Sequence, residues 1–74
     1  MEFDGTRLRK VRKGRALSLR DLGKLAGVSY DAIHAIEVGK QEPRPSTVRK
    51  LAAALGIEPE VLFTNPDESG KTVA

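Results

Sequence analysis

The sequence predicts a compact all-α domain of five helices, and three observations support this fold class. Apolar residues recur every three or four positions in separate short stretches, which is the spacing of one helix face. Glycine, serine or proline stands at the ends of these stretches, where helices begin and end. No stretch alternates apolar and polar residues as a half-buried strand does. The 74 residues suffice for one domain, whose core buries about 60% of the surface of the unfolded chain.

The first helix is expected from about residue 4 or 6 to residue 13. Asp4 lies near its positive end, and Leu8 and Val11 point inward. Gly14 is expected to end the helix because glycine tolerates the backbone conformation of a helix terminus.

Residues 18–39 predict two short amphipathic helices joined by a turn of about three residues. Ser18 is expected to cap the first of them, and Ser29 the second. Gly27 is expected to enter the left-handed region in the turn at little cost. The first of the two helices is expected to bury one stripe of apolar residues: Leu19, Leu22, Leu25 and Ala26.

The second of the two helices, about residues 30–38, is expected to turn Ile33 and Ile36 inward and to end at Gly39. Its opposite side then carries five residues: Tyr30, Asp31, His34, Ala35 and Val38. Two helices joined in this way present the second helix to a partner, and DNA is the partner that this geometry suits.

The polar stretch 40–45 is expected to be a rigid loop, because Pro43 and Pro45 deny helical geometry to the residues before them. A fourth helix is expected from residue 45 or 46 to residue 55, closed by Gly56. Its core stripe consists of Val48, Leu51, Ala52 and Leu55.

A short fifth helix is expected from about residue 58 to residue 63, with Pro59 in its first turn and Phe63 anchored in the core. The domain is therefore placed at residues 1–63. Residues 64–74 have almost no large apolar side chain to offset their ordering entropy, and a flexible C-terminal tail is expected there.

Positive charge is concentrated in the predicted domain. Residues 1–57 hold twelve of the 13 Lys and Arg residues but six of the 10 Asp and Glu residues. Six of these cations follow one another without an intervening acid: Arg7, Arg9, Lys10, Arg12, Lys13 and Arg15. Such a run is a candidate footprint for phosphates, and a solvated helix face is the alternative.

Composition excludes several classes of function. The chain has no Cys and one His, so it forms neither a disulfide nor a zinc cluster, and no cofactor or metal is expected. No catalytic constellation is present, and we expect no enzyme activity. The longest apolar run, residues 51–55, is far shorter than a membrane helix of about 20 residues, and a soluble, cytoplasmic protein is expected.

Five pieces of the sequence, in this order, resemble the lambda-repressor-like (Cro/Xre-type) helix-turn-helix family. They are residues 8–12, 17–22, 26–29, Ile33 with 36–40, and 51–57. The resemblance extends from Leu8 to Phe63 and implies a five-helix domain that binds operator DNA. It also implies a structural ion pair between Arg12 and Glu37. A carboxylate near a helix C-terminus opposes the helix dipole, so Glu37 is best placed beside a cation.

The sequence departs from the family pattern at two positions. Leu19 stands where family members often have a DNA-contacting glutamine, so Ser18, Arg20 or backbone amides must hold the phosphate instead. Gly23 stands where the family usually has alanine, which keeps the clearance between the two helices at about 1 kcal/mol of helix propensity.

By family position, the resemblance implies base contacts from Tyr30, Asp31 and Ala35. Two interpretations stay open for the first two residues. Tyr30 either meets the DNA or covers the preceding helix, and Asp31 either accepts from a cytosine amino group or stabilises the helix dipole. Backbone contacts are expected from Ser18, Arg20, Ser29, His34, Lys40 and Arg44, with plain surface exposure as the alternative for the last three.

The sequence thus predicts a sequence-specific regulator of transcription, expected to be a repressor, with residues 30–38 in the major groove of double-stranded DNA. A homodimer on a palindromic operator is expected, joined through Val61, Leu62 and the tail, unless these residues simply close the core. The alternative is an antitoxin-like interaction protein that binds a toxin or another regulator and binds DNA secondarily.

Overall fold

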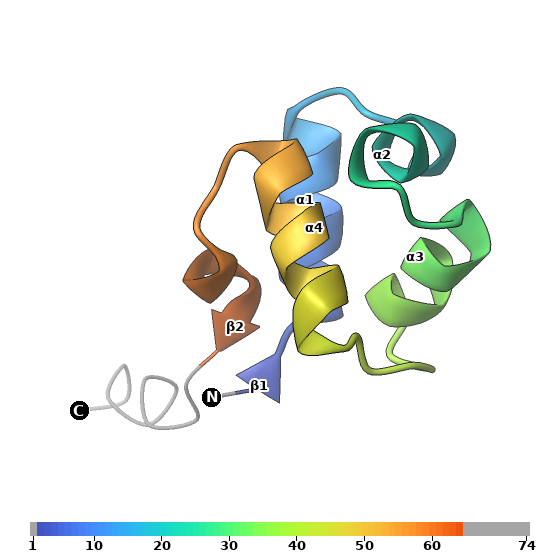
Figure 1. Cartoon of the computed structure of the whole chain (residues 1–74). Coiled ribbons are helices and arrows are strands. Elements are labelled where there is room, and N and C mark those ends of the chain that lie inside the picture. Colours follow the sequence, from blue (N-terminus) through green and yellow to red (C-terminus); the bar gives the residue numbers. More distant parts are fainter. Residues whose placement is uncertain (1, 65–74) are drawn as a thin grey trace.

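Four α-helices, one short 3₁₀ helix and a two-stranded sheet make up the described part of the chain, residues 2–64 of the computed structural model (Figure 1). In chain order these elements are β1 (Glu2–Phe3), α1 (Gly5–Gly14), α2 (Leu19–Ala26), α3 (Tyr30–Glu37), α4 (Pro45–Leu55), the 3₁₀ helix η1 (Pro59–Leu62) and β2 (Phe63–Thr64). Figure 1 shows α2 and α3 on one side of α4, and η1 with the sheet on the other.

The predicted helix starts and the predicted turn are present. The Ser18 hydroxyl accepts from the Asp21 N–H at 3.0 Å, and the Asp21 carboxylate accepts from the Ser18 N–H at 3.0 Å, which forms a capping box. The Ser29 hydroxyl accepts from the Ala32 N–H at 3.2 Å. Gly27 ends α2 in the left-handed region, at φ 71°. Residues 27–29 therefore form the turn between α2 and α3.

The core takes its largest buried side chains from every helix: Leu8, Leu22, Ile33, Leu51, Leu55 and Leu62. The predicted stripes of α3 and α4 are confirmed, but the stripe of α2 is wrong at Leu25, which is 61% exposed. At about 100° per residue, Leu25 is turned roughly 100° away from Ala26 and 120° away from Leu19. It therefore lies beside the buried stripe and not within it.

Helix α1 ends at Gly14, as predicted, but the left-handed residue that follows the helix is Ala16, which has a φ of 58°. The Leu17 N–H donates to the Arg12 carbonyl at 3.1 Å, and the Ala16 N–H donates to the Lys13 carbonyl at 2.9 Å. These bonds satisfy the last carbonyls of α1 and hold an alanine where glycine is preferred.

The prediction of five helices is wrong in its last element. Residues 59–62 form a 3₁₀ helix, and Phe63 then turns extended and pairs with Phe3 in an antiparallel two-stranded sheet. Two residues per strand are too few to show alternation in a sequence, so the pattern could not reveal the sheet. Phe63 is half-buried, and its ring meets the Phe3 ring edge-on, with centroids 5.6 Å apart.

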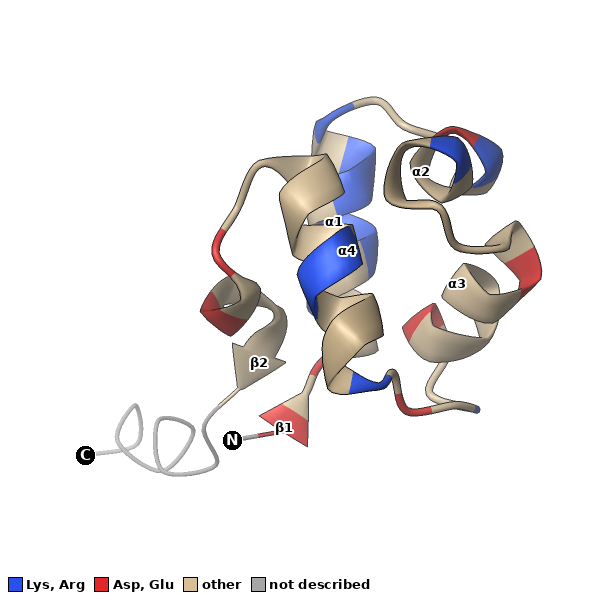
Figure 2. Cartoon of the chain, viewed as in Figure 1, with Lys and Arg blue, Asp and Glu red and all other residues tan. Residues whose placement is uncertain are grey.

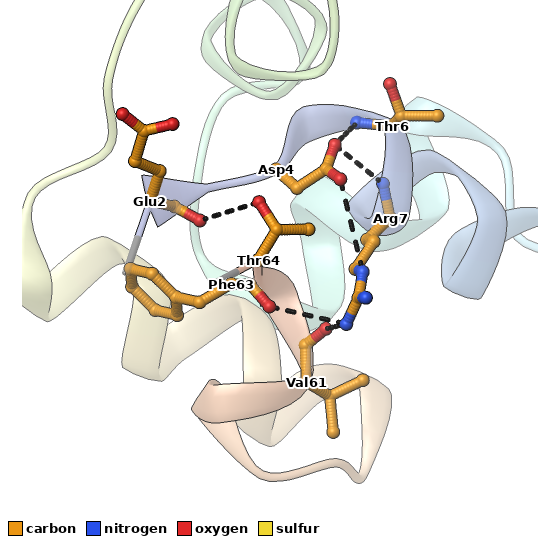
Figure 3. A network of polar contacts seen from close by, with 7 residues as sticks. All are labelled: Glu2, Asp4, Thr6, Arg7, Val61, Phe63 and Thr64. Carbon is orange, nitrogen blue, oxygen red and sulfur yellow. Dashed lines mark hydrogen bonds and ion pairs between the residues drawn. The ribbon is translucent and has the colours of Figure 1, made fainter. Parts of the chain in front are cut away.

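Polar contacts join the start of α1 to the end of η1 (Figure 3). The Asp4 N–H donates to the Leu62 carbonyl at 2.8 Å, and the Asp4 carboxylate caps α1 by accepting from the Thr6 N–H at 2.9 Å. Arg7 donates from Nη1 to the Val61 and Phe63 carbonyls at 3.4 and 3.3 Å. The Arg7 guanidinium therefore has hydrogen-bond partners within the protein.

The predicted tail begins inside β2, since Thr64 pairs with Glu2. Residues 65–74, for which flexibility is predicted, lie outside the described residues. Among the helices between residues 2 and 64, none combines the length and apolar character needed to cross a membrane.

Candidate nucleic-acid interface

The backbones of α2 and α3 approach each other closely at Gly23. A β-carbon built on Gly23 would lie 2.7 Å from the Val28 carbonyl oxygen and 3.5 Å from the Tyr30 nitrogen. The small residue thus provides the clearance that the sequence predicts. The close approach fixes the first turn of α3 against the middle of α2.

The two sides of α3 differ in exposure. Ile33, Ile36 and Glu37 are buried in the protein. The other side holds four residues predicted to contact DNA: Tyr30, Asp31 and His34 are exposed, and Ala35 is half-buried. Val38, which follows α3 on the same side, is exposed as well. The side of α3 that the sequence predicts to contact DNA is therefore accessible to solvent.

Arg12 and Glu37 form a bidentate ion pair between α1 and the last turn of α3. Arg12 Nε donates to Glu37 Oε2 at 2.7 Å, and Arg12 Nη2 donates to Glu37 Oε1 at 3.1 Å. The two side chains are 9% and 3% exposed. The hydrogen bonds to Glu37 raise the pKa of Arg12 above its usual value, although burial acts in the opposite direction. Arg12 Nη1 also donates to the Leu17 carbonyl at 2.8 Å, so one guanidinium joins α1, α3 and the loop before α2.

Tyr30 contacts α2 as well as solvent. The Arg20 guanidinium carbon lies 5.2 Å from the centroid of the Tyr30 ring, within the range of a cation–π contact. Both residues line a shallow groove of about 420 Å³ with Gly23, Lys24 and Val28. Tyr30 therefore partly covers α2 and still keeps 44% of its surface exposed.

A cleft of about 510 Å³ lies where α1, the start of α2 and α3 meet. Its lining includes Ser18 and His34, two of the predicted backbone contacts. Arg9 and Lys13 from α1 line the same cleft. Their spacing of four residues puts both cations on one side of α1. The sequence alone does not single out these two cations, because other pairs in the run of six also share a side of the helix.

Lys40 and Arg44 lie in the loop between α3 and α4, and both are exposed. The Lys40 N–H donates to the Ala35 carbonyl at 2.9 Å, next to Gly39 at φ 82°. This contact places Lys40 directly beside the C-terminal end of α3. Arg44 is the residue before the first turn of α4.

A family model described as helix-turn-helix matches residues 8–62 of the chain. The chain belongs to this helix-turn-helix family. The match confirms the resemblance found in the sequence.

One curated helix-turn-helix relative is the transcriptional repressor RghR of Bacillus subtilis strain 168, which is 44% identical over 64 residues. These residues are 85% of this chain and 47% of that protein. The chain spans less than half the length of the curated relatives it matches. Such relatives are named as transcriptional regulators, which supports the prediction that this family domain binds and does not catalyse.

Two solved structures share the helix-turn-helix fold. The restriction-modification controller protein C.AhdI from Aeromonas hydrophila is 37% identical, with a TM-score of 0.78 over 80% of this chain and 89% of that chain. The P22 c2 repressor in complex with a synthetic operator is 33% identical, with a TM-score of 0.78 over 86% of this chain and 97% of that chain.

The lysines and arginines of this helix-turn-helix domain lie around α3 and not on it. Within its bounds, Tyr30–Glu37, α3 carries two carboxylates and no Lys or Arg. Figure 2 shows the cations on α1, α2, α4 and the loop after α3, whereas η1 and β1 are acidic. Cations that bind phosphates must therefore come from the elements that flank α3.

Proposed function

We propose that the chain acts as a sequence-specific transcriptional regulator, a repressor, with α3 in the major groove of double-stranded DNA. The observation that carries this proposal is the solvent-exposed side of α3. The buried Arg12–Glu37 ion pair holds the opposite side of this helix against α1. A major groove admits one helix, and the first turns of a recognition helix lie deepest in it. The likeness to an operator-bound repressor supports the same function.

Base recognition is assigned to Tyr30, Asp31 and Ala35. Tyr30 offers an aromatic edge to a thymine methyl and a hydroxyl to a base or phosphate, and Asp31 offers an acceptor to a cytosine amino group. Ala35 is half-buried and offers only a methyl group, so its contribution is apolar contact with thymine.

Backbone contacts are assigned to two groups next to α3. In the first, the cleft brings Ser18 and His34 together with Arg9 and Lys13. In the second, Lys40 and Arg44 follow α3 in an exposed loop. Arg20 and Ser29 complete the set, although the Ser29 hydroxyl already caps α3. Both groups supply cations close to α3, where they can reach the phosphates that border a groove.

We propose a homodimer on a palindrome whose half-sites lie about one helical turn apart. Of the two predicted interface residues in η1, Leu62 is fully buried in the core. Val61 is 42% exposed and is the one left available to a second copy. Such a regulator acts on DNA in the cytoplasm.

Selection of sites from a random pool of duplex DNA tests this function. If the regulator is a dimer, the selected sites should be palindromic. The logarithm of its affinity for DNA should fall with the logarithm of the salt concentration, at a slope of about −0.9 per phosphate contacted. Absence of binding at about 50 mM salt contradicts the proposal and favours the protein-interaction alternative.

The phosphate contact proposed at the cleft is tested by replacing one cation of the cleft and, as a control, one cation elsewhere on the surface. Lys13→Ala should weaken binding to all sequences and make the salt slope shallower by about one contact. Arg49→Ala is the control, because Arg49 lines a different groove, beside Phe3 and Pro59. Equal losses from the two variants contradict a phosphate site at the cleft.

A further inference from the structure

Arg20 and Tyr30 form a contact across the helix-turn-helix that neither residue's separate role explains. Arg20 lies in the first turn of α2, and Tyr30 is the first residue of α3. The guanidinium of Arg20 lies over the Tyr30 ring at 5.2 Å from its centroid. Both residues line the groove that also includes Gly23, where a β-carbon would lie 2.7 Å from the Val28 carbonyl oxygen.

The contact restricts a side chain that would otherwise be free to rotate. Tyr30 is 44% exposed and stands at the end of α3 that enters deepest into a groove. Its ring reaches different base edges in different rotamers. A guanidinium over one face of the ring favours a single ring orientation, and 44% of the Tyr30 surface stays exposed to a partner.

We propose that Arg20 is a positioning residue for base selection: by stacking on Tyr30, it fixes the ring in the orientation that reads one base pair. This inference rests on the proposed function, because it concerns the DNA contact of α3. It assigns Arg20 a role in sequence preference beyond the backbone contact expected from the sequence.

Lys24 provides a matched control within the same groove. It is an exposed cation of α2 that lines the groove with Arg20, but the cation–π contact is made by Arg20. Arg20→Lys retains the positive charge and removes the planar face that stacks. Lys24→Gln removes a charge from the same surface and leaves the stack intact.

The first measurement needs no DNA. Tyr30 is the single tyrosine, and the chain has no tryptophan, so tyrosine fluorescence reports on Tyr30 alone. Arg20→Lys should lower the fluorescence anisotropy of Tyr30 and change its near-ultraviolet circular dichroism, whereas Lys24→Gln should leave both as in the wild type. Unchanged spectra in Arg20→Lys would overturn the inference independently of any DNA binding.

The second measurement compares the selected DNA site with sites altered at single base pairs. Arg20→Lys should reduce discrimination at one base-pair position by up to about fivefold, the value expected if an exposed cation–π contact is lost entirely, since an ammonium retains part of the contact. The salt slope should stay as in the wild type. In a Tyr30→Ala background, Arg20→Lys should have no further effect on discrimination, whereas in Tyr30→Phe, which keeps the ring, its effect should persist.

Two outcomes separate the failure of this inference from that of the proposed function. If the wild type selects a site and Arg20→Lys weakens binding equally at every altered site, as Lys24→Gln does, Arg20 is a backbone contact only and the inference is wrong. If the wild type binds no DNA while Arg20→Lys still frees the Tyr30 ring, the stack is real but the proposed function, and with it the role in base selection, is overturned.

Discussion

The guanidinium of Arg12 and the carboxylate of Glu37 share two hydrogen bonds in the interior, 25 residues apart in the chain. The pair joins α1 to the end of the proposed recognition helix. Both charges have lost most of their water, so each depends on the other for compensation. Removing one partner is therefore far more harmful than removing both.

Glu37→Leu should lower the free energy of unfolding by about 3–5 kcal/mol, because it leaves the Arg12 cation buried without a counter-charge. The double variant Arg12→Met with Glu37→Leu should be much less destabilised than the sum of the two single variants. Urea unfolding measures all four free energies. Additive losses would show that the pair is not energetically coupled.

Acid should weaken the capping box at the start of α2. The backbone N–H of Ser18, and then its hydroxyl, hold the pKa of Asp21 below its usual value. Because the pKa is lower in the folded state, Asp21 contributes stability above its unfolded pKa and loses that contribution as the pH falls through the folded pKa.

The difference in unfolding free energy between wild type and Asp21→Ala should therefore be largest near neutral pH and shrink below about pH 4. Chemical denaturation over a series of pH values measures this difference. A difference that stays constant down to acid pH would contradict an ionised cap.

The first residue of α1 should tolerate no side chain. A β-carbon on Gly5 would lie 2.6 Å from the Glu37 carbonyl oxygen and still closer to that of Ile36. Gly5→Ala should thus push α1 away from the end of α3 and destabilise the domain by about 1–3 kcal/mol. Thermal unfolding monitored by circular dichroism measures the effect.

Gly14→Ala is the matched control at the other end of the same helix. Nothing lies within 4 Å of a β-carbon at Gly14, so the added methyl group should stabilise the domain by about 0.5–1 kcal/mol. If both variants are stabilised, α1 and α3 are not in close backbone contact.

Local rules predicted most of the helix-turn-helix from the sequence. The serine caps at 18 and 29 and the left-handed Gly27 each depend on neighbours within a few residues, and the structure shows all three. Helical spacing also predicted which side of α3 is exposed, because Ile33 and Ile36 define its buried half. The Arg12–Glu37 pair required the family resemblance, since no local pattern joins residues so distant.

Features set by distant contacts escaped prediction. Gly5 has no room for a side chain because the last carbonyls of α3 lie against it, and the Arg7 guanidinium donates to the carbonyls of Val61 and Phe63. The sheet exists because Phe3 and Phe63 meet, although neither strand is long enough to show a pattern. The stacking of Arg20 on Tyr30 likewise appears only once α2 and α3 are packed together.

Ala16 is a position where glycine should improve the domain. Its φ of 58° lies in the left-handed region, which is unfavourable for a residue with a β-carbon. Ala16→Gly should raise the free energy of unfolding by about 0.5–1 kcal/mol, after the greater freedom of glycine in the unfolded chain is subtracted. Ala53→Gly, at an exposed site within α4, is the control and should lower it by about 1 kcal/mol. Urea unfolding of both variants decides the matter, because a loss of stability in both would mean that residue 16 does not hold a left-handed conformation in solution.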